Sequence, residues 1–344
     1  MFPVEANNGI RILRYQEVSS LLCGSDRELM DVIETAYLAH ATGKTTLPHS
    51  TFLRFPNGSS NRIIALPAYM DCGARSAGLK WIASFPRNTH RGLDRASAVI
   101  VLNSVETGRP LAILEASLIS AKRTAASAAI AAERLHAGRP VRSMGFVGCG
   151  LINFETAQFL RVVFPELADA VVLDNDPDQA QKFRGKLLAR KPHWNCQVVR
   201  QWADIVKATD MISIATTASA PHIDTLADCK PRTTILHISL RDIAPRALLE
   251  CDNITDDVDH VCREGTSLHL AEGIVGHRQF IRATLGEILQ GKVPAHNGDM
   301  NPVVFSPFGL GVLDLGVGQW IAQRAAERGI GTIVESFLPE GQCW

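Results

Sequence analysis

Apolar residues recur with helical and with strand spacing along the chain, and from Met144 the pattern changes to a regular alternation of strands and helices. Before this point, the helical spacing of Leu29, Ile33 and Ala36 predicts one helix, which begins with a capping box at Ser25. Apolar runs bounded by Gly, Pro and Asn then predict strands. These runs are Thr51–Phe55, Arg62–Met70, Gly78–Phe85, Ser97–Asn103 and Pro110–Ala116, with hairpin turns expected at Asn57-Gly58 and Thr107-Gly108. An α+β unit rich in antiparallel strands is therefore expected in the first third of the chain.

Further along, an alanine-rich helix over residues 119–136 is followed by strand–helix alternation. Strands are expected at Met144–Val147, Ala170–Asp174, Gln197–Arg200, Met211–Ala215 and Ile235–Ser239, and helices at Asn153–Val163, Pro177–Ala189 and Trp202–Ala208. Such alternation is typical of a parallel, doubly wound sheet. A last helix over residues 309–329 is long enough to return to the first unit. The predicted class is α/β: a Rossmann-type domain at residues 126–310, and an α+β domain at residues 1–125 with 311–344.

Composition narrows the possible partners. The 344 residues include 46% hydrophobic and only 20% charged residues, which favours an oligomer that buries part of its surface. Lys plus Arg and Asp plus Glu both number 35, so no overall basic field favours nucleic acid or a membrane surface. The eight cysteines form no C-x-x-C pair, which indicates buried thiols and no metal site. With no signal-like start and no long apolar span, a cytoplasmic location is expected.

A glycine turn carries the strongest chemical signal. Gly148-Cys149-Gly150 follows a predicted strand and opens a predicted helix, and Asp174 closes the next strand. This arrangement places a diphosphate at a helix N-terminus and a carboxylate at the adenosine ribose. Asp174 would repel a 2′-phosphate, so NAD is favoured over NADP; the alternative is a helix-capping Asp before Pro177. Asn153 replaces the third glycine or alanine of the motif, where it either caps the helix or loosens its packing on the strand.

The cofactor site is expected to use residues from the glycine turn and from later strand ends. Its predicted members are Gly148, Gly150, Leu151, Ile152, Asn153, Asp174, Thr216, Thr217, Ser239 and Thr124. For Thr216 and Thr217 the alternative is an ordinary pair of turn hydroxyls.

Lys80 stands alone among apolar residues. Strand alternation places it on one face with Gly78 and Ile82, opposite Leu79 and Trp81. It either extends from an edge strand into solvent, or points into a cavity where burial lowers its pKa toward that of a general base.

Two further places combine charge with an unusual position. Arg123 lies near the start of the alanine-rich helix, where a cation is unfavourable unless an anion is close by; the alternative is a solvated Arg. Asp242 follows the predicted fifth strand of the parallel sheet, at the edge where ligands bind. It is either an acid/base group or an ammonium-binding carboxylate, or else a surface partner of Arg241. His237 fits a core histidine with a bonded ring better than a catalyst.

At these residues the chain resembles the ornithine cyclodeaminase/mu-crystallin family over nearly its whole length. The shared features are the Lys80 strand, the Ser-x-x-x-x-x-Arg-Thr-Ala-Ala segment from Ser117, the glycine turn, and the closing segment 305–314. The resemblance implies that Arg54, Lys80 and Arg123 bind the substrate carboxylate and take part in catalysis. It also implies that Asp242 is the acidic catalytic residue, that the first domain binds substrate, and that a homodimer forms through its sheet.

The segment Ser239-Leu240-Arg241-Asp242-Ile243 departs from the glycine-rich pattern of true cyclodeaminases. Together with residues 92–98 it resembles the branch that makes 2,3-diaminopropionate for siderophore or other natural-product biosynthesis. The implied reaction is an NAD-dependent oxidative cleavage of N-(2-amino-2-carboxyethyl)-L-glutamate, with Arg241 as an extra cation for a substrate that carries three carboxylates. Two alternatives stay open: a cyclodeaminase that converts ornithine to proline and ammonia, and a mu-crystallin-like protein that binds nucleotide and ligand with little turnover.

Overall fold

The structure is a computed structural model that describes residues 8–56, 60–136 and 138–339. The chain divides into two compact units, Met1–Arg123 with Leu310–Trp344, and Thr124–Gly309. These bounds differ by one or two residues from the predicted domain limits. The predicted turn at Asn57-Gly58 lies outside the described residues.

The first unit is built on one mixed sheet with strand order β16-β1-β7-β6-β5-β4-β2, and β3 pairs with β4. Its strands are β1 (Ile10–Leu13), β2 (Thr45–Thr46), β3 (Thr51–Arg54), β4 (Arg62–Asp71), β5 (Arg75–Ser84), β6 (Ala96–Asn103), β7 (Pro110–Glu115) and β16 (Thr332–Val334). Its helices are α1 (Tyr15–Leu22), α2 (Asp26–Ala41), the short 3-10 helix Pro86–Arg91, and α11 (Gly311–Glu327). The start of α3 (Ser117–Leu135), through Arg123, also belongs here.

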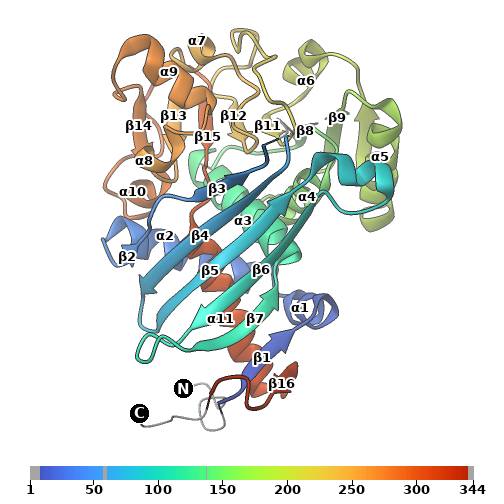
Figure 1. Ribbon diagram of the computed structural model, residues 1–344. Helices are drawn as coiled ribbons and strands as arrows, with labels where there is room; N and C mark the ends of the chain where they lie inside the picture. Colours follow the sequence, from blue (N-terminus) through green and yellow to red (C-terminus); the bar gives the residue numbers. More distant parts are fainter. Residues whose placement is uncertain (1–7, 57–59, 137, 340–344) are drawn as a thin grey trace. The chain divides into compact units, whose positions relative to one another are not determined.

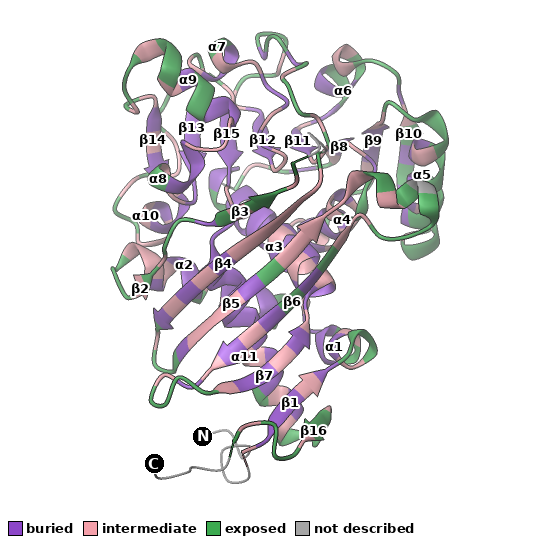
Figure 2. Ribbon diagram, in the orientation of Figure 1, coloured by how far each residue is buried: buried purple, intermediate pink, exposed green. Residues whose placement is uncertain are grey.

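Helix α11 covers one face of this sheet, where it contacts β4, β5 and β6, and it packs against α2 (Figure 1). The close approach requires a residue without a side chain on β5. A Cβ at Gly78 would lie 2.3 Å from the Val101 carbonyl oxygen and 2.9 Å from Leu315 Cδ1. On the opposite face, Leu53, Trp81 and Val99 are 48%, 40% and 38% exposed. The five antiparallel strands and the alternation predicted around Lys80 are confirmed, and Figure 2 shows the alternation as bands of colour along β4–β6.

The second unit is a parallel sheet with strand order β10-β9-β8-β11-β12-β15-β13-β14. Its strands are β8 (Ser143–Val147), β9 (Asp169–Leu173), β10 (Asn195–Val198), β11 (Met211–Ile214), β12 (Thr234–His237), β13 (Asp252–Thr255), β14 (Ile281–Thr284) and β15 (Val303–Ser306). Its helices are α4 (Leu151–Val163), α5 (Pro177–Arg190), α6 (Trp202–Ala208), α7 (Pro245–Leu248), α8 (Val258–Val261), α9 (Ser267–Val275) and α10 (Leu285–Leu289).

The strand order reverses between β8 and β11, as in doubly wound nucleotide-binding folds, so the predicted Rossmann-type class is confirmed. The last three strands were not predicted. Two of them, with the sequences Asp-Asn-Ile-Thr and Ile-Arg-Ala-Thr, hold no continuous apolar run. No helix among the described residues is long and apolar enough to cross a membrane.

One local prediction was wrong. Ser25 is the N-cap of α2, but its side chain makes no capping hydrogen bond. The Ser25 hydroxyl instead accepts a hydrogen bond from Arg324 of α11 at 3.1 Å, so a contact between helices replaces the expected capping box.

Candidate active site

In the first unit, a buried carboxylate holds two cations together. Asp314, in the first turn of α11, accepts hydrogen bonds from Lys80 Nζ at 2.6 Å and from Arg123 Nε at 2.9 Å. The side chains of Lys80 and Asp314 are 2% and 0% exposed, and that of Arg123 is 10% exposed. The Ser120 hydroxyl lies 3.4 Å from Lys80 Nζ. One anion therefore serves two cations, so the cluster carries a net positive charge.

This environment lowers the pKa of Lys80. Burial is the largest cause, and the neighbouring Arg123 adds to it. The charge and hydrogen bond of Asp314 act in the opposite direction, and the resulting pKa is about 8, against an ordinary value of 10.5. A lysine with this pKa exchanges a proton near neutral pH.

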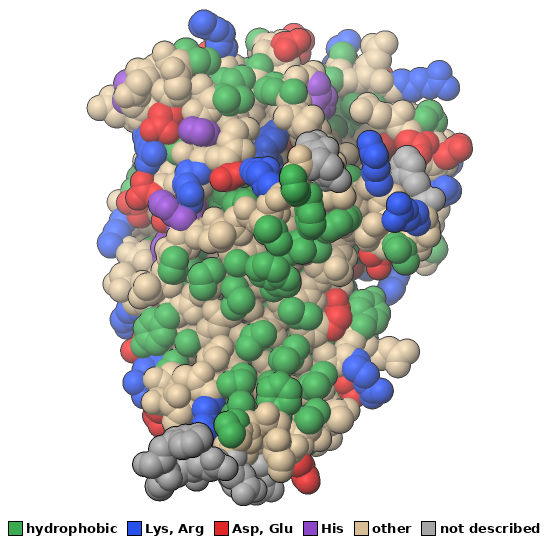
Figure 3. Space-filling model, in the orientation of Figure 1, with side chains coloured by type: hydrophobic (Ala, Val, Ile, Leu, Met, Phe, Trp, Pro, Cys, Tyr) green, Lys and Arg blue, Asp and Glu red, His purple; other side chains and the backbone are tan. Residues whose placement is uncertain are grey.

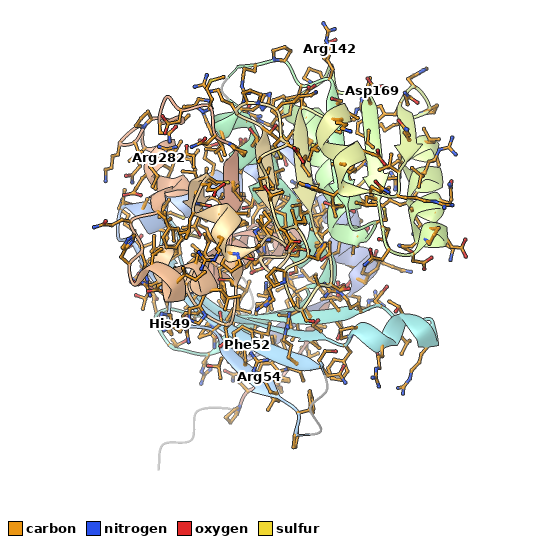
Figure 4. The ribbon with its side chains drawn as sticks, turned by 90° about the horizontal axis from the view of Figure 1, so that it is seen from above. His49, Phe52, Arg54, Arg142, Asp169 and Arg282 are labelled. Carbon is orange, nitrogen blue, oxygen red and sulfur yellow. The ribbon has the colours of Figure 1, made fainter. Side chains whose placement is uncertain are left out.

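Arg54 lies apart from this cluster. Arg54 pairs with Arg62 of β4, which in turn pairs with Ser84 of β5. Arg54 is therefore on the same face of the sheet as Lys80, but it lies two strands away and about 13 Å further along the strand direction. Its guanidinium carbon is 5.4 Å from the centre of the Phe52 ring, and Figure 4 shows the two side chains together.

In the second unit, the turn after β8 has the geometry of a diphosphate site. Gly148 has a φ of +88°, and a Cβ there would lie 2.4 Å from the Ala215 carbonyl oxygen. Gly150 is the N-cap of α4, and a Cβ there would meet nothing within 4 Å, so the helix N-terminus is open. Leu151 is exposed and Ile152 half-buried at this end. Free backbone N–H groups at an accessible helix N-terminus fit the diphosphate of a dinucleotide.

Side chains around this turn fix its backbone. Asp174 Oδ2 accepts a hydrogen bond from the backbone N–H of Cys149 at 2.7 Å, and Gln179 Nε2 donates to the Cys149 carbonyl at 2.7 Å. Burial raises the pKa of the Cys149 thiol to about 12, so this thiol is not a nucleophile. The half-buried Asp174 stands at the end of β9, where it fits a ribose-binding carboxylate. The residue that caps α5 is Asp176.

A second buried carboxylate lies at the carboxyl ends of β11 and β12. The Ser239 hydroxyl lies 2.5 Å from Asp242 Oδ2, and the Thr216 hydroxyl donates to Asp242 Oδ1. The Nε2 atom of His237 lies 3.2 Å from the Asp242 backbone nitrogen and 3.4 Å from Oδ2. On the other side of the ring, Nδ1 of His237 lies 3.3 Å from the Ser306 hydroxyl. The predicted bonded ring of His237 is thus present.

Asp242 is ionised at neutral pH. Burial alone would raise its pKa, but the hydrogen bond and charge of His237, together with the hydroxyls of Ser239 and Thr216, reverse this and lower the pKa to about 2. The turn that holds Asp242 is strained, since Leu240 has a φ of +68°. In the same turn, Arg241 donates to the Glu264 carbonyl at 2.7 Å.

Comparison with known proteins identifies a family. Residues 11–329 match the ornithine cyclodeaminase/mu-crystallin family. The chain belongs to this family.

Individual relatives within the family are amino-acid dehydrogenases. The N-((2S)-2-amino-2-carboxyethyl)-L-glutamate dehydrogenase of Staphylococcus aureus is 29% identical over 90% of this chain and 93% of its own length. The alanine dehydrogenase of Archaeoglobus fulgidus is 28% identical over 95% of this chain and 98% of its own length. A solved archaeal alanine dehydrogenase, described as a dimer with bound NAD, superposes with a TM-score of 0.85 at 26% identity, covering 96% of this chain and all of its own. The predicted family and enzyme class are confirmed, and the predicted cofactor agrees with the NAD bound in this solved structure.

The structure changes the reasoning at two predicted residues. Arg123 is almost two turns inside α3, so the helix N-terminus does not explain it; its anion is Asp314. Asn153 does not cap α4, because its amide nitrogen donates to the carbonyls of Val147 and Gly148. Asp314 itself was not predicted as a site residue, although an Asp in the apolar run 310–317 was a visible signal.

Of the remaining predicted residues, Thr217 is exposed after β11, and Thr124 is half-buried in α3. Their roles toward a cofactor stay predictions.

Replacing Asp314 by Asn should strongly destabilise the first unit. Lys80 and Arg123 would face each other in a buried place without a counter-charge, which costs about 3 kcal/mol or more. The measurement is the free energy of unfolding from denaturant titration. Asp31→Asn is the matched control, because the Arg27–Asp31 pair is 62% and 66% exposed and contributes less than about 1 kcal/mol. If both variants lost the same small amount of unfolding free energy, the buried cluster would not stabilise the unit.

Proposed function

We propose that this chain is an NAD-dependent dehydrogenase that cleaves N-(2-amino-2-carboxyethyl)-L-glutamate to 2-oxoglutarate and L-2,3-diaminopropionate. The observation that supports this most is the net-positive cluster of Lys80, Arg123 and Asp314, combined with the similarity to the Staphylococcus aureus enzyme over 90% of the chain. A substrate with three carboxylates suits a site rich in cations better than ornithine, which has one. The product would supply siderophore or other natural-product biosynthesis, and a cytoplasmic location stays a prediction.

Bound NAD supplies the hydride acceptor for the glutamyl α-carbon, and the glycine turn with Asp174 would hold it. Hydride loss requires an unprotonated amine nitrogen and leaves an iminium on the substrate. Water adds to the iminium carbon, a proton moves to the nitrogen, and the C–N bond breaks to give the keto acid and the free amine. One water is consumed, and one proton is released besides the hydride.

Lys80 is the residue best suited to carry these protons. With a pKa of about 8, a substantial fraction of its side chain is neutral just above neutral pH and can accept a proton. Asp242, with a pKa of about 2, stays ionised and is a weak base. Its proposed role is to stabilise the positive charge that develops on the nitrogen.

Arginine side chains are proposed to hold the carboxylates. In Arg123, Nε is bonded to Asp314, and the two terminal nitrogens of the guanidinium are proposed to make a two-point contact with a substrate carboxylate. Arg54 and Arg241 are proposed for the other carboxylates of the substrate.

The assay that tests this reaction follows NADH absorbance with three substrates: the glutamate adduct, L-alanine and L-ornithine. We expect continuous NADH formation with the adduct, together with equal amounts of 2-oxoglutarate and 2,3-diaminopropionate. Lys80→Met is the matched variant, and it should lose most of the turnover while still binding NADH. Proline formed from ornithine without net NADH would indicate the cyclodeaminase instead. NADH from alanine alone would indicate an alanine dehydrogenase, and nucleotide binding without turnover would indicate a mu-crystallin-like binding protein.

We also propose that the chain forms a homodimer through the sheet of the first unit. Leu53, Trp81 and Val99 are exposed on the face opposite α11, and Figure 3 shows hydrophobic side chains gathered over these strands. Exposed apolar patches of this kind mark interaction surfaces.

Light scattering during size-exclusion chromatography should give twice the mass of one chain. Trp81→Glu should give the mass of one chain, whereas Leu270→Glu, at an exposed position on α9, should leave the dimer intact. A monomeric wild-type protein would contradict this proposal.

A further inference from the structure

Asn153 occupies the position at which dinucleotide-binding turns carry a third glycine or alanine. It is 0% exposed and is the third residue of α4, after the N-cap Gly150. An Asn near a helix N-terminus commonly caps it by accepting from backbone N–H groups. Here the side chain turns the other way, toward the strand.

The side-chain amide of Asn153 holds the two carbonyls at the start of the turn. Its Nδ2 donates to the Val147 carbonyl at 2.9 Å and to the Gly148 carbonyl at 2.7 Å. Both hydrogens of the NH2 group are therefore used, and both carbonyl oxygens are kept on the inner side of the turn. The backbone N–H groups in the first turn of α4 stay available for an anion.

Ser213 fixes the orientation of this amide. It is a fully buried hydroxyl in β11, a strand that is otherwise apolar. Its Oγ donates to Asn153 Oδ1 at 2.7 Å. An amide turned by 180° would place its oxygen against two carbonyl oxygens and its NH2 group against the Ser213 hydroxyl, so the observed orientation is favoured.

We propose that Asn153, oriented by Ser213, is a positioning residue for the diphosphate of the bound dinucleotide. It keeps the Gly148 carbonyl turned away from the anion, which would otherwise meet its negative end, and it adds to the Ala215 N–H that already holds the Val147 carbonyl. A glycine or alanine at position 153 has no side-chain amide to hold a carbonyl, so the departure from the common motif contributes directly to the proposed diphosphate site. The inference is independent of the amino-acid substrate.

The direct test is the dissociation constant of NADH, measured by fluorescence titration without substrate. Asn153→Ala restores a small residue of the common motif, and we expect it to weaken NADH binding about tenfold, as for the loss of one or two buried hydrogen bonds. Ser213→Ala should weaken binding by about threefold. Because Ser213 acts through Asn153, the double variant should bind no more weakly than Asn153→Ala alone.

Thr209→Val is the matched control. Thr209 is also fully buried, and its hydroxyl donates to the Ile205 carbonyl at 2.8 Å, away from the glycine turn. Its NADH affinity should match that of the wild type. Thermal unfolding of each variant shows whether it is folded, and Ser213→Ala provides the test if Asn153→Ala does not fold. Wild-type or tighter NADH binding by Asn153→Ala, or by Ser213→Ala in that case, would overturn the proposal, as would fully additive losses in the double variant.

Discussion

The buried contact between Asp314 and two cations is the interaction on which the chemistry of the first unit depends. A lysine and an arginine on the covered side of a sheet are strongly unfavourable without a counter-charge. Asp314 supplies that charge from α11, and this residue lies 234 residues after Lys80 and 191 after Arg123 in the chain. The chain must therefore complete the second unit and return before the cluster can form. The C-terminal helix is thus part of the candidate site as well as part of the core.

The surroundings of Lys80 in the first unit and of Asp242 in the second unit shift the two pKa values so that opposite charge states are favoured, the neutral amine and the ionised carboxylate. Around Lys80, burial and a second cation outweigh one carboxylate, so the amine is ready to lose its proton. Around Asp242, the hydrogen bond and charge of His237 and two hydroxyl groups outweigh burial, so the carboxylate keeps its charge. Groups whose environments separate their pKa values in this way can divide proton transfer and charge stabilisation between them. This division gives Lys80 and Asp242 distinct proposed roles, which their positions in the sequence left undecided.

Much of this arrangement could be predicted from local patterns. Strand alternation placed Lys80 on one face with Gly78 and Ile82, and the glycine turn with Asp174 indicated the nucleotide-binding sheet. What could not be predicted depends on contacts between distant segments. The partner of Arg123 is on another helix. The amide of Asn153 is bonded to Ser213 of β11, which becomes its neighbour only because β8 and β11 pair in the sheet. Strands β13 and β14 were not predicted because neither holds a continuous apolar run.

The central claim is that Lys80 titrates near neutral pH because of its buried surroundings. The most direct measurement is an NMR titration of the protein labelled with 13C at the lysine ε-carbons, with Lys80→Met to assign the signal. One lysine resonance should titrate with a midpoint near pH 8. In a folded Asp314→Asn variant the midpoint should move lower, because the removed carboxylate is the group that raises it. A Lys80 signal that titrates with the exposed lysines, near pH 10, would contradict the account.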